Sequence, residues 1–169
     1  MNGHRYFRRF IYLDFDSVLH HDSVYIHPTK GIYIREPGFT LFEWTPILDE
    51  LLEAHPDVGI ILSTSWVRAK SFSYAKSRLS PELQKRVIGA TFHKGCMNKE
   101  LFTQLTRTNQ ILADVSRRGL GDDWIAIDDE AEGWPFMYAK KLIRTGWAGI
   151  SAPEVQAEIK TWLNKRTKA

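Results

Sequence analysis

The sequence predicts an α/β protein in which a mainly parallel sheet lies between two layers of helices. Two observations lead to this prediction. Short apolar runs that suit buried strands alternate with amphipathic stretches of helical period along the whole chain. Three of these runs also end in polar or acidic side chains, as expected where parallel strands present their carboxyl ends at one edge. The 169 residues suit one domain, so we expect residues 1–169 to form a single unit.

The first half of the chain is expected to hold two strands, a hairpin and two helices. Alternating apolar residues on both sides of Pro28–Gly31 predict a β-hairpin flap over residues 23–34. Thr45 and Pro46 open a helix that runs to about His55, because proline is favoured at the first helical position. The other elements of this half are strands at Arg9–Leu13 and Val58–Leu62 and one helix over Val67–Leu79.

The second half is expected to complete the sheet. A helix over Thr108–Arg118 is ended by Gly119, a residue type that favours the left-handed backbone found at helix ends. The run Ser151–Glu154 has the pattern of a capping box and predicts the start of the last helix. Residues 92–106 carry no clear pattern. The remaining predicted elements are a short helix opened by Ser80 and Pro81 and strands at Val87–Thr91, Trp124–Ile127 and Lys141–Ile143.

Oxygen-bearing side chains follow three of the predicted strands. They are Asp14 and Asp16 after the first strand, Ser63, Thr64 and Ser65 after the second, and Asp128 and Asp129 after the fourth. Carboxylates so close in sequence repel each other unless a cation lies between them. The ends of parallel strands meet at one edge, and hard oxygen ligands suit Mg²⁺. The sequence therefore predicts a site for Mg²⁺ and phosphate at this edge of the sheet.

These segments resemble a known family. The runs Asp14–Leu19, Leu62–Trp66 and Ile125–Asp129 are similar to motifs I, II and IV of the haloacid dehalogenase (HAD) superfamily. The chain most resembles the small HAD domains associated with RNA and nucleic-acid repair proteins, which Leu41–Trp44 and Arg86–Thr91 also match. The resemblance covers nearly the whole chain. It implies a Rossmann-like three-layer sandwich and a HAD-type phosphatase that uses Mg²⁺.

The resemblance also implies roles for the acids. Asp14 would attack phosphorus and form a phosphoaspartyl intermediate. Asp16 would protonate the leaving oxygen and then act as base toward the hydrolytic water. The metal ligands would be the Asp14 carboxylate, the main-chain carbonyl of Asp16 and an acid of the pair Asp128 and Asp129. Which member of that pair touches the metal directly stays open.

Polar and basic residues would complete the implied site. Ser63 would hydrogen-bond a phosphoryl oxygen, and Thr64 and Lys99 are further candidates for substrate binding. The third motif of the family supplies one cation that balances the nucleophile and the phosphate. Arg107 is our first choice, because it lies at the start of the helix that leads into the fourth strand. Lys99 and Lys94 are the alternatives, and a structural role for Arg107 at a helix start stays open.

Five residues in or beside the motifs depart from the family pattern or extend it. Many family members have glycine where Ser17 stands, and we expect Ser17 to make the same turn with a negative φ. The adjacent His20 and His21 should point in different directions, so a loop or substrate-edge role is favoured over metal ligation. Trp66 and Trp134 follow motifs II and IV, so either could line the mouth of the site.

The spacing of the motifs leaves no room for a large cap domain. The segment before Thr45 holds little more than a hairpin, and the segment after the third strand is equally short. An open site suits a phosphate at the end of a macromolecule. A lid from a second copy would restore small substrates, and the oligomeric state is not predicted. Tyr25, Tyr33 and Phe39 could stack on a base, although packing on a sheet face is the expectation we favour.

Composition adds weaker constraints on partners and location. The net charge is +3, and basic clusters at residues 4–9, 117–118, 140–141 and 160–168 are compatible with a polyanion. An ordinary solvated surface explains them equally well. The single Cys96 excludes an internal disulfide and favours a reducing, cytoplasmic compartment. No apolar run approaches membrane-spanning length, and no signal peptide is visible.

The leading hypothesis is a phosphomonoesterase for nucleic-acid terminal phosphates or nucleotides. One alternative is a HAD phosphatase of small metabolites or phosphoproteins. Another is a non-catalytic nucleic-acid-binding module on the same scaffold, whose binding would be salt-sensitive and independent of Mg²⁺.

Overall fold

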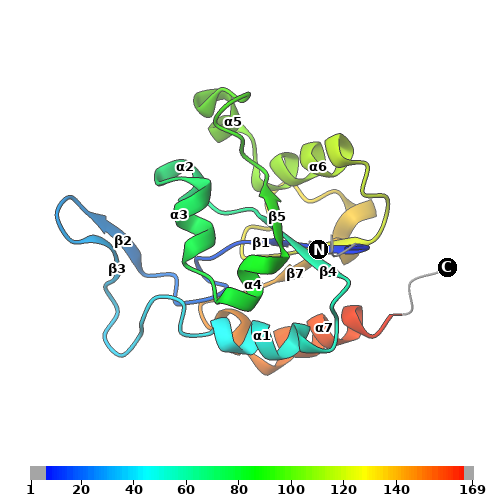
Figure 1. Cartoon of the computed structure of the whole chain (residues 1–169), viewed down its shortest axis with the longest axis horizontal. Coiled ribbons are helices and arrows are strands. Elements are labelled where there is room, and N and C mark those ends of the chain that lie inside the picture. The colour runs from blue at the N-terminus through cyan, green and yellow to red at the C-terminus, as the bar shows by residue number, and fades with distance from the viewer. Residues whose placement is uncertain (1–6, 166–169) are drawn as a thin grey trace, which may run out of the picture.

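A five-stranded parallel sheet forms the centre of the protein (Figure 1). The structure, a computed structural model, describes residues 7–165. The strand order is β5-β4-β1-β6-β7, and every neighbouring pair is parallel. The bounds are β1 Arg9–Leu13, β4 Val58–Leu62, β5 Val87–Ala90, β6 Trp124–Asp128 and β7 Leu142–Arg144. The α/β prediction with a mainly parallel sheet is therefore confirmed.

Helices connect the strands and cover both faces of the sheet. The α-helices are α1 Thr45–Glu53, α2 Trp66–Ala69, α3 Phe72–Ser77, α4 Pro81–Arg86, α5 Lys99–Gln104, α6 Arg107–Arg118 and α7 Pro153–Leu163. Two short 3₁₀ helices, η1 Phe136–Lys141 and η2 Gly149–Ser151, precede and follow β7. In Figure 1, α1 and α7 lie side by side below the sheet, and α6 lies above it.

The alternation of side chains along each strand divides the core into two layers. Ile11 and Leu13 of β1 belong to the larger cluster, together with α1 and α7. Tyr12, between them, belongs to the smaller cluster with Trp124 and with Ile111 of α6. Strands that are apolar on both faces must be covered on both faces, so the continuous apolar runs in the sequence account for the three-layer arrangement.

A hairpin is the insertion between β1 and α1. It pairs β2 (Val24–His27) with β3 (Gly31–Ile34) in antiparallel register, as predicted, and projects from the body of the molecule in Figure 1. Tyr25 and Tyr33 face each other across the two strands with ring centroids 6.2 Å apart. They pack against each other on one face of the hairpin, as expected, but remain 45% and 36% exposed. Within residues 7–165 no larger insertion covers the carboxyl edge of the sheet.

Two helix predictions need correction. The single helix expected over Val67–Leu79 is broken into α2 and α3, because the Ser71 hydroxyl accepts a hydrogen bond from the Tyr74 amide and starts a new helix. The capping box expected at Ser151–Glu154 is also absent. Ala152 is the N-cap of α7 and offers no side-chain acceptor, while the Ser151 hydroxyl donates to the Ala148 carbonyl.

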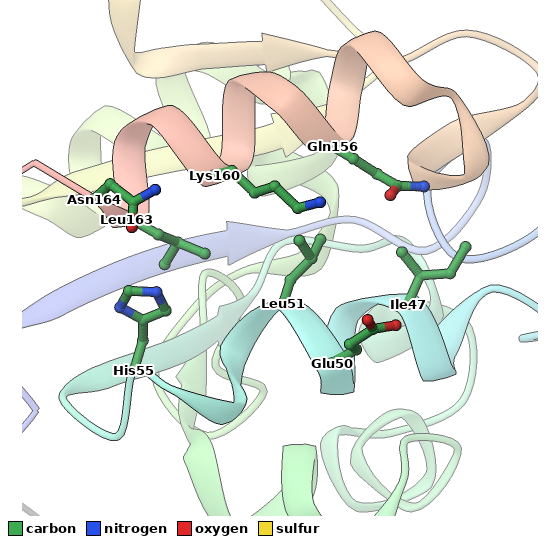
Figure 2. A pocket seen from close by; sticks show the side chains of 8 residues that line it. All are labelled: Ile47, Glu50, Leu51, His55, Gln156, Lys160, Leu163 and Asn164. Carbon is green, nitrogen blue, oxygen red and sulfur yellow. The ribbon is translucent and has the colours of Figure 1, made fainter.

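A small groove separates α1 from α7. Figure 2 shows Glu50 and Leu51 on α1 opposite Gln156 and Lys160 on α7. The groove encloses about 160 Å³, and none of the acids at the carboxyl edge of the sheet lines it.

Two further expectations concern the basic clusters near the chain ends and helices that could span a membrane. His4, Arg5 and Lys168, which belong to the predicted basic clusters, lie outside the described residues. Among residues 7–165, no helix has both the length and the apolar character needed to cross a bilayer.

Candidate active site

The three oxygen-rich segments meet at the carboxyl edge of the sheet because β1 pairs with both β4 and β6. The hydrogen-bond ladder continues one residue beyond the strand ends. The Ser63 amide donates to the Leu13 carbonyl at 2.8 Å, and the Asp14 amide donates to the Ile127 carbonyl at 3.2 Å. Asp14, Ser63 and Asp128 are thus held beside one another by backbone bonds, as the order of the strands requires.

Three carboxylates form a cluster that could hold a metal ion. Each of Asp14, Asp128 and Asp129 contributes one oxygen, and these oxygens all lie within 4.8 Å of one another. Asp14 is 4% exposed and Asp128 is fully buried, so bulk water does not solvate the charge of either carboxylate. Asp129 is less buried. Such an arrangement costs free energy unless a cation compensates for it.

Arg107, at the start of α6, is the cation that the described structure places against these acids. Its Nη2 lies 3.7 Å from Asp14 Oδ2 and 3.5 Å from Glu130 Oε1, and its Nε lies 3.3 Å from Asp128 Oδ2. Its Nη1 donates to the Ser63 carbonyl. Burial alone would lower the pKa of Arg107, but the three carboxylates raise it well above its ordinary value.

One guanidinium does not neutralise the cluster. Burial raises the pKa of both Asp14 and Asp128 well above the ordinary aspartate value, and the charge of Arg107 lowers both only in part. Among the described residues the buried Asp128 Oδ2 has no aligned hydrogen bond, although Arg107 Nε lies nearby. An orphaned buried carboxylate oxygen among three acids fits a hard divalent cation such as Mg²⁺.

Asp129 lies beside the turn that follows β1. Burial raises the pKa of Asp129, and a hydrogen bond with the Ser17 side chain opposes this shift. Ser17 has φ 59°, so the expectation of a negative φ is wrong. The serine adopts the left-handed conformation that glycine takes without strain, at a cost of roughly 1 kcal/mol. The strained turn brings its hydroxyl to Asp129.

The predicted phosphate-binding residues differ in their surroundings. Ser63 is fully buried and its hydroxyl has no hydrogen-bond partner in the described structure. The Thr64 hydroxyl accepts a hydrogen bond from the Trp66 amide at 3.4 Å, so it also supports the start of α2. Lys99 and Lys94 are exposed, and within residues 7–165 neither forms an ion pair with the acidic cluster. Their proposed contacts with substrate remain predictions.

The Asp16 carboxylate is not one of the three acids of the cluster, and it contacts aromatic neighbours instead. Its Oδ1 accepts hydrogen bonds from His20 Nε2 and from Trp66 Nε1, both at 2.9 Å. His20 is fully buried. His21 instead packs against Phe39, with ring centroids 4.4 Å apart. The two histidines therefore face different surroundings, as expected for neighbours on a loop.

Two residues of the site were not singled out from the sequence. Glu130 pairs with Arg107, and the acidic run that continues from Asp129 was the only signal for it. Arg68 of α2 stacks over the Phe102 ring at 5.4 Å, and its Nη1 is buried without a hydrogen-bond partner in the part of the chain that the structure describes. Burial and the charge of Arg107 lower the pKa of Arg68. No sequence motif pointed to this second guanidinium.

The stability of the protein should respond to Mg²⁺ in a pH-dependent way. Asp14 and Asp128 have folded-state pKa values raised above the unfolded value of about 3.9. Their contribution to metal-free stability is therefore complete below about pH 4 and is lost as the pH rises through the folded values. Mg²⁺ requires the ionised carboxylates, so its stabilising effect should grow with pH.

We expect Mg²⁺ at about 100 times its Kd to add about 2.7 kcal/mol, or roughly 5–10 °C, near pH 8 and much less near pH 5. Thermal unfolding followed by fluorescence with and without Mg²⁺ measures this difference. Asp128→Asn should remove most of the shift. An equal shift at both pH values would contradict the assignment of these acids to the metal.

Residues 10–155 match a family described as "HAD domain in Swiss Army Knife RNA repair proteins". No curated protein and no solved structure matched the chain. The matched range begins inside β1 and ends inside α7, so it contains every site residue described above.

Proposed function

Because the chain belongs to the family of HAD domains in Swiss Army Knife RNA repair proteins, we propose that it is a Mg²⁺-dependent phosphomonoesterase that acts on nucleic-acid terminal phosphates. The observation that carries this proposal is the cluster of Asp14, Asp128 and Asp129 beside Arg107. It combines a carboxylate nucleophile with residues suited to a divalent cation, in a position where phosphate would otherwise be repelled.

The residues of the chain account for each step of hydrolysis. The Asp14 carboxylate attacks phosphorus, and a bond from its oxygen forms while the bond to the leaving oxygen breaks. Asp16 gives its proton to the leaving oxygen and then takes one from the water that attacks the phosphoaspartyl group. Asp14, the Asp16 carbonyl and Asp128 or Asp129 would hold Mg²⁺, which would supply charge neutralisation when bound. Inorganic phosphate leaves and Asp14 is regenerated.

Two of the buried polar atoms that have no hydrogen-bond partner within residues 7–165 are proposed to hold the phosphoryl group. They are the Ser63 hydroxyl and Arg68 Nη1. Each would otherwise remain unsatisfied, and phosphoryl oxygens are strong acceptors for both. Arg107 is engaged with the acids, so we assign the phosphoryl group to Arg68, whose Nη1 has no hydrogen-bond partner within residues 7–165.

The hairpin supports a nucleic acid as substrate. Tyr25 and Tyr33 are exposed on one side of the flap, and the Arg35 guanidinium lies 5.6 Å from the Tyr25 ring. Exposed aromatic rings beside a cation are the combination that binds single-stranded nucleic acid by stacking. With no large cap within residues 7–165, a polymer end can approach the carboxyl edge of the sheet.

Removing the flap tyrosines should weaken the binding of oligonucleotides selectively. We expect Tyr25→Ala with Tyr33→Ala to raise KM for a phosphorylated oligonucleotide by roughly 5- to 150-fold, the effect of losing one stacked base. The KM for p-nitrophenyl phosphate should not change, because that ester carries no nucleobase for the tyrosines to stack on. Tyr25→Phe with Tyr33→Phe keeps both rings and should behave like wild type. Steady-state kinetics on both substrates measure these KM values.

A panel of phosphate esters tests the proposed function. Phosphate release is measured with Mg²⁺ on 3′-phosphate and 5′-phosphate oligonucleotides, sugar phosphates and phosphopeptides, with Asp14→Asn as the control for contaminating phosphatases. Preference for the oligonucleotides is expected. Preference for sugar phosphates or phosphopeptides would reject the nucleic-acid assignment and favour the alternative substrates. Release from no ester, with salt-sensitive RNA binding that needs no Mg²⁺, would favour a non-catalytic binding module.

A further inference from the structure

His20, in the loop after β1, forms hydrogen bonds with Phe42 and with Asp16, and the proposed catalytic roles do not use this histidine. His20 is fully buried, and both of its ring nitrogens are occupied. Its Nδ1 lies 3.2 Å from the Phe42 amide nitrogen, and its Nε2 lies 2.9 Å from Asp16 Oδ1. The residues that this ring connects are far apart in the chain, and one of them is the proposed acid and base.

The partners of the ring determine its tautomer. A backbone N–H only donates, so Nδ1 of His20 must accept from Phe42 and carries no proton. The proton of the neutral ring is then on Nε2, and it points to Asp16 Oδ1. The same oxygen accepts from Trp66 Nε1, which is also only a donor. Asp16 Oδ1 thus receives two N–H groups, and the other oxygen is left to exchange a proton with substrate.

The backbone at Phe42 supports a specific role for this chain of bonds. Phe42 has φ 62°, a left-handed conformation that is unfavourable for a bulky residue. Its ring packs edge-on against both His20 and Trp66, with centroid distances of 4.8 and 5.1 Å. Strain of this kind persists only where the surroundings enforce it, and it is often found at functional sites.

We infer that His20 is a positioning residue that holds Asp16 in the orientation needed to protonate the leaving oxygen. This inference rests on the proposed function, since it assigns a supporting residue to the same reaction. Trp66 shares the role through the second hydrogen bond to Asp16 Oδ1. The histidine acts through Asp16 and does not itself touch substrate or metal.

Leaving groups of different basicity separate this role from a purely structural one. A ribose oxygen must be protonated as it leaves, whereas p-nitrophenolate leaves without a proton. The measured quantity is kcat/KM, which reports only the steps up to formation of the phosphoaspartyl group. His20→Asn can still accept from Phe42 but is too short to reach Asp16. His20→Gln places an amide N–H near the position of Nε2.

We expect His20→Asn to lower kcat/KM for a phosphorylated oligonucleotide by about 10²-fold, the lower end of general acid catalysis. The value for p-nitrophenyl phosphate should fall by less than about 3-fold, because that leaving group needs no acid. His20→Gln should recover most of the oligonucleotide activity. His55→Asn, at a partly buried histidine of the groove between α1 and α7, is the control and should change neither value. Equal losses on both substrates, or no loss, would overturn the inference.

A spectroscopic measurement distinguishes failure of this inference from failure of the proposed function. Nitrogen NMR of the histidine rings, assigned with His20→Gln, should show His20 as the neutral tautomer with its proton on Nε2. That resonance should move in Asp16→Asn. If the wild type cleaves no ester, the proposed function fails, while this spectrum still reports whether His20 holds Asp16. A proton on Nδ1, or a resonance unaffected by Asp16→Asn, would reject the inference.

Discussion

Replacing Asp14 with asparagine should abolish turnover and at the same time stabilise the metal-free protein. The nucleophile is lost, so we expect kcat to fall by at least about 10⁴-fold, as in other enzymes that lose a covalent nucleophile. The gain in stability has a separate cause. Asp14 is buried beside Asp16 and Asp129, and burial and their charges oppose its ionisation.

The sign of the stability change follows from the raised pKa of Asp14. The folded wild type retains the proton to a higher pH than the unfolded chain, so it loses stability as the pH rises above about 4. The asparagine variant has no such loss. Its advantage in metal-free buffer should therefore increase from about pH 5 to about pH 8. Urea unfolding at the two pH values measures it, and Asp22→Asn, at an exposed acid, is the control.

Asp14→Asn should also reduce the stabilisation that Mg²⁺ provides. A variant that is inactive, less stable than wild type at every pH and still stabilised by Mg²⁺ would contradict the placement of Asp14 in the metal cluster. It would indicate that the loss of activity came from damage to the fold.

Replacing Arg107 with leucine should produce the largest loss of stability at this site. The guanidinium is 8% exposed and lies against three carboxylates, of which Asp14 and Asp128 are buried. Removing one partner of a buried ion pair leaves uncompensated charge and costs about 3–5 kcal/mol. We expect a loss of this size near neutral pH without Mg²⁺.

The pH dependence identifies the cause of that loss. Without Arg107 the pKa values of Asp14 and Asp128 rise further, and protonation at low pH removes the repulsion between them. The loss of stability should be smaller near pH 5 than at neutral pH. At neutral pH, it should become smaller when Mg²⁺ is added.

Arg117→Gln is a matched control on the same helix, because Arg117 is half exposed and Asp114 retains its contacts with Arg118 and Tyr12. It should cost less than about 1 kcal/mol. A loss of stability in Arg107→Leu that does not depend on pH would indicate lost packing instead.

Local patterns in the sequence were sufficient to predict the sheet and the convergence of its acids. Continuous apolar runs such as Val58–Leu62 predict strands buried on both faces, and helices between them require parallel connections. Parallel strands present their carboxyl ends at one edge, so acids that follow separate strands must meet there. This rule predicts that Asp14 and Asp128 lie close together, and it needs no knowledge of side-chain distances.

Two other local patterns did not form the predicted structure, because serine side chains make competing hydrogen bonds. The capping-box pattern at Ser151–Glu154 had the right residues, but the Ser151 hydroxyl donates to Ala148 in the preceding 3₁₀ turn. The helix expected over Val67–Leu79 lacked an obvious break, yet Ser71 starts a second helix there. In both cases a serine could form more than one local hydrogen bond, and the sequence alone does not rank them.

The sequence by itself therefore determined the fold class and the set of acids at the carboxyl edge, because strand and helix periodicity are encoded by neighbouring residues. Only the tertiary structure decided how those acids are balanced. Arg107 reaches Asp14 and Asp128 from another element, and His20 contacts Asp16 while accepting a hydrogen bond from Phe42, 22 residues away. Such contacts depend on the distances between elements after packing, which the spacing of residues along the chain does not specify.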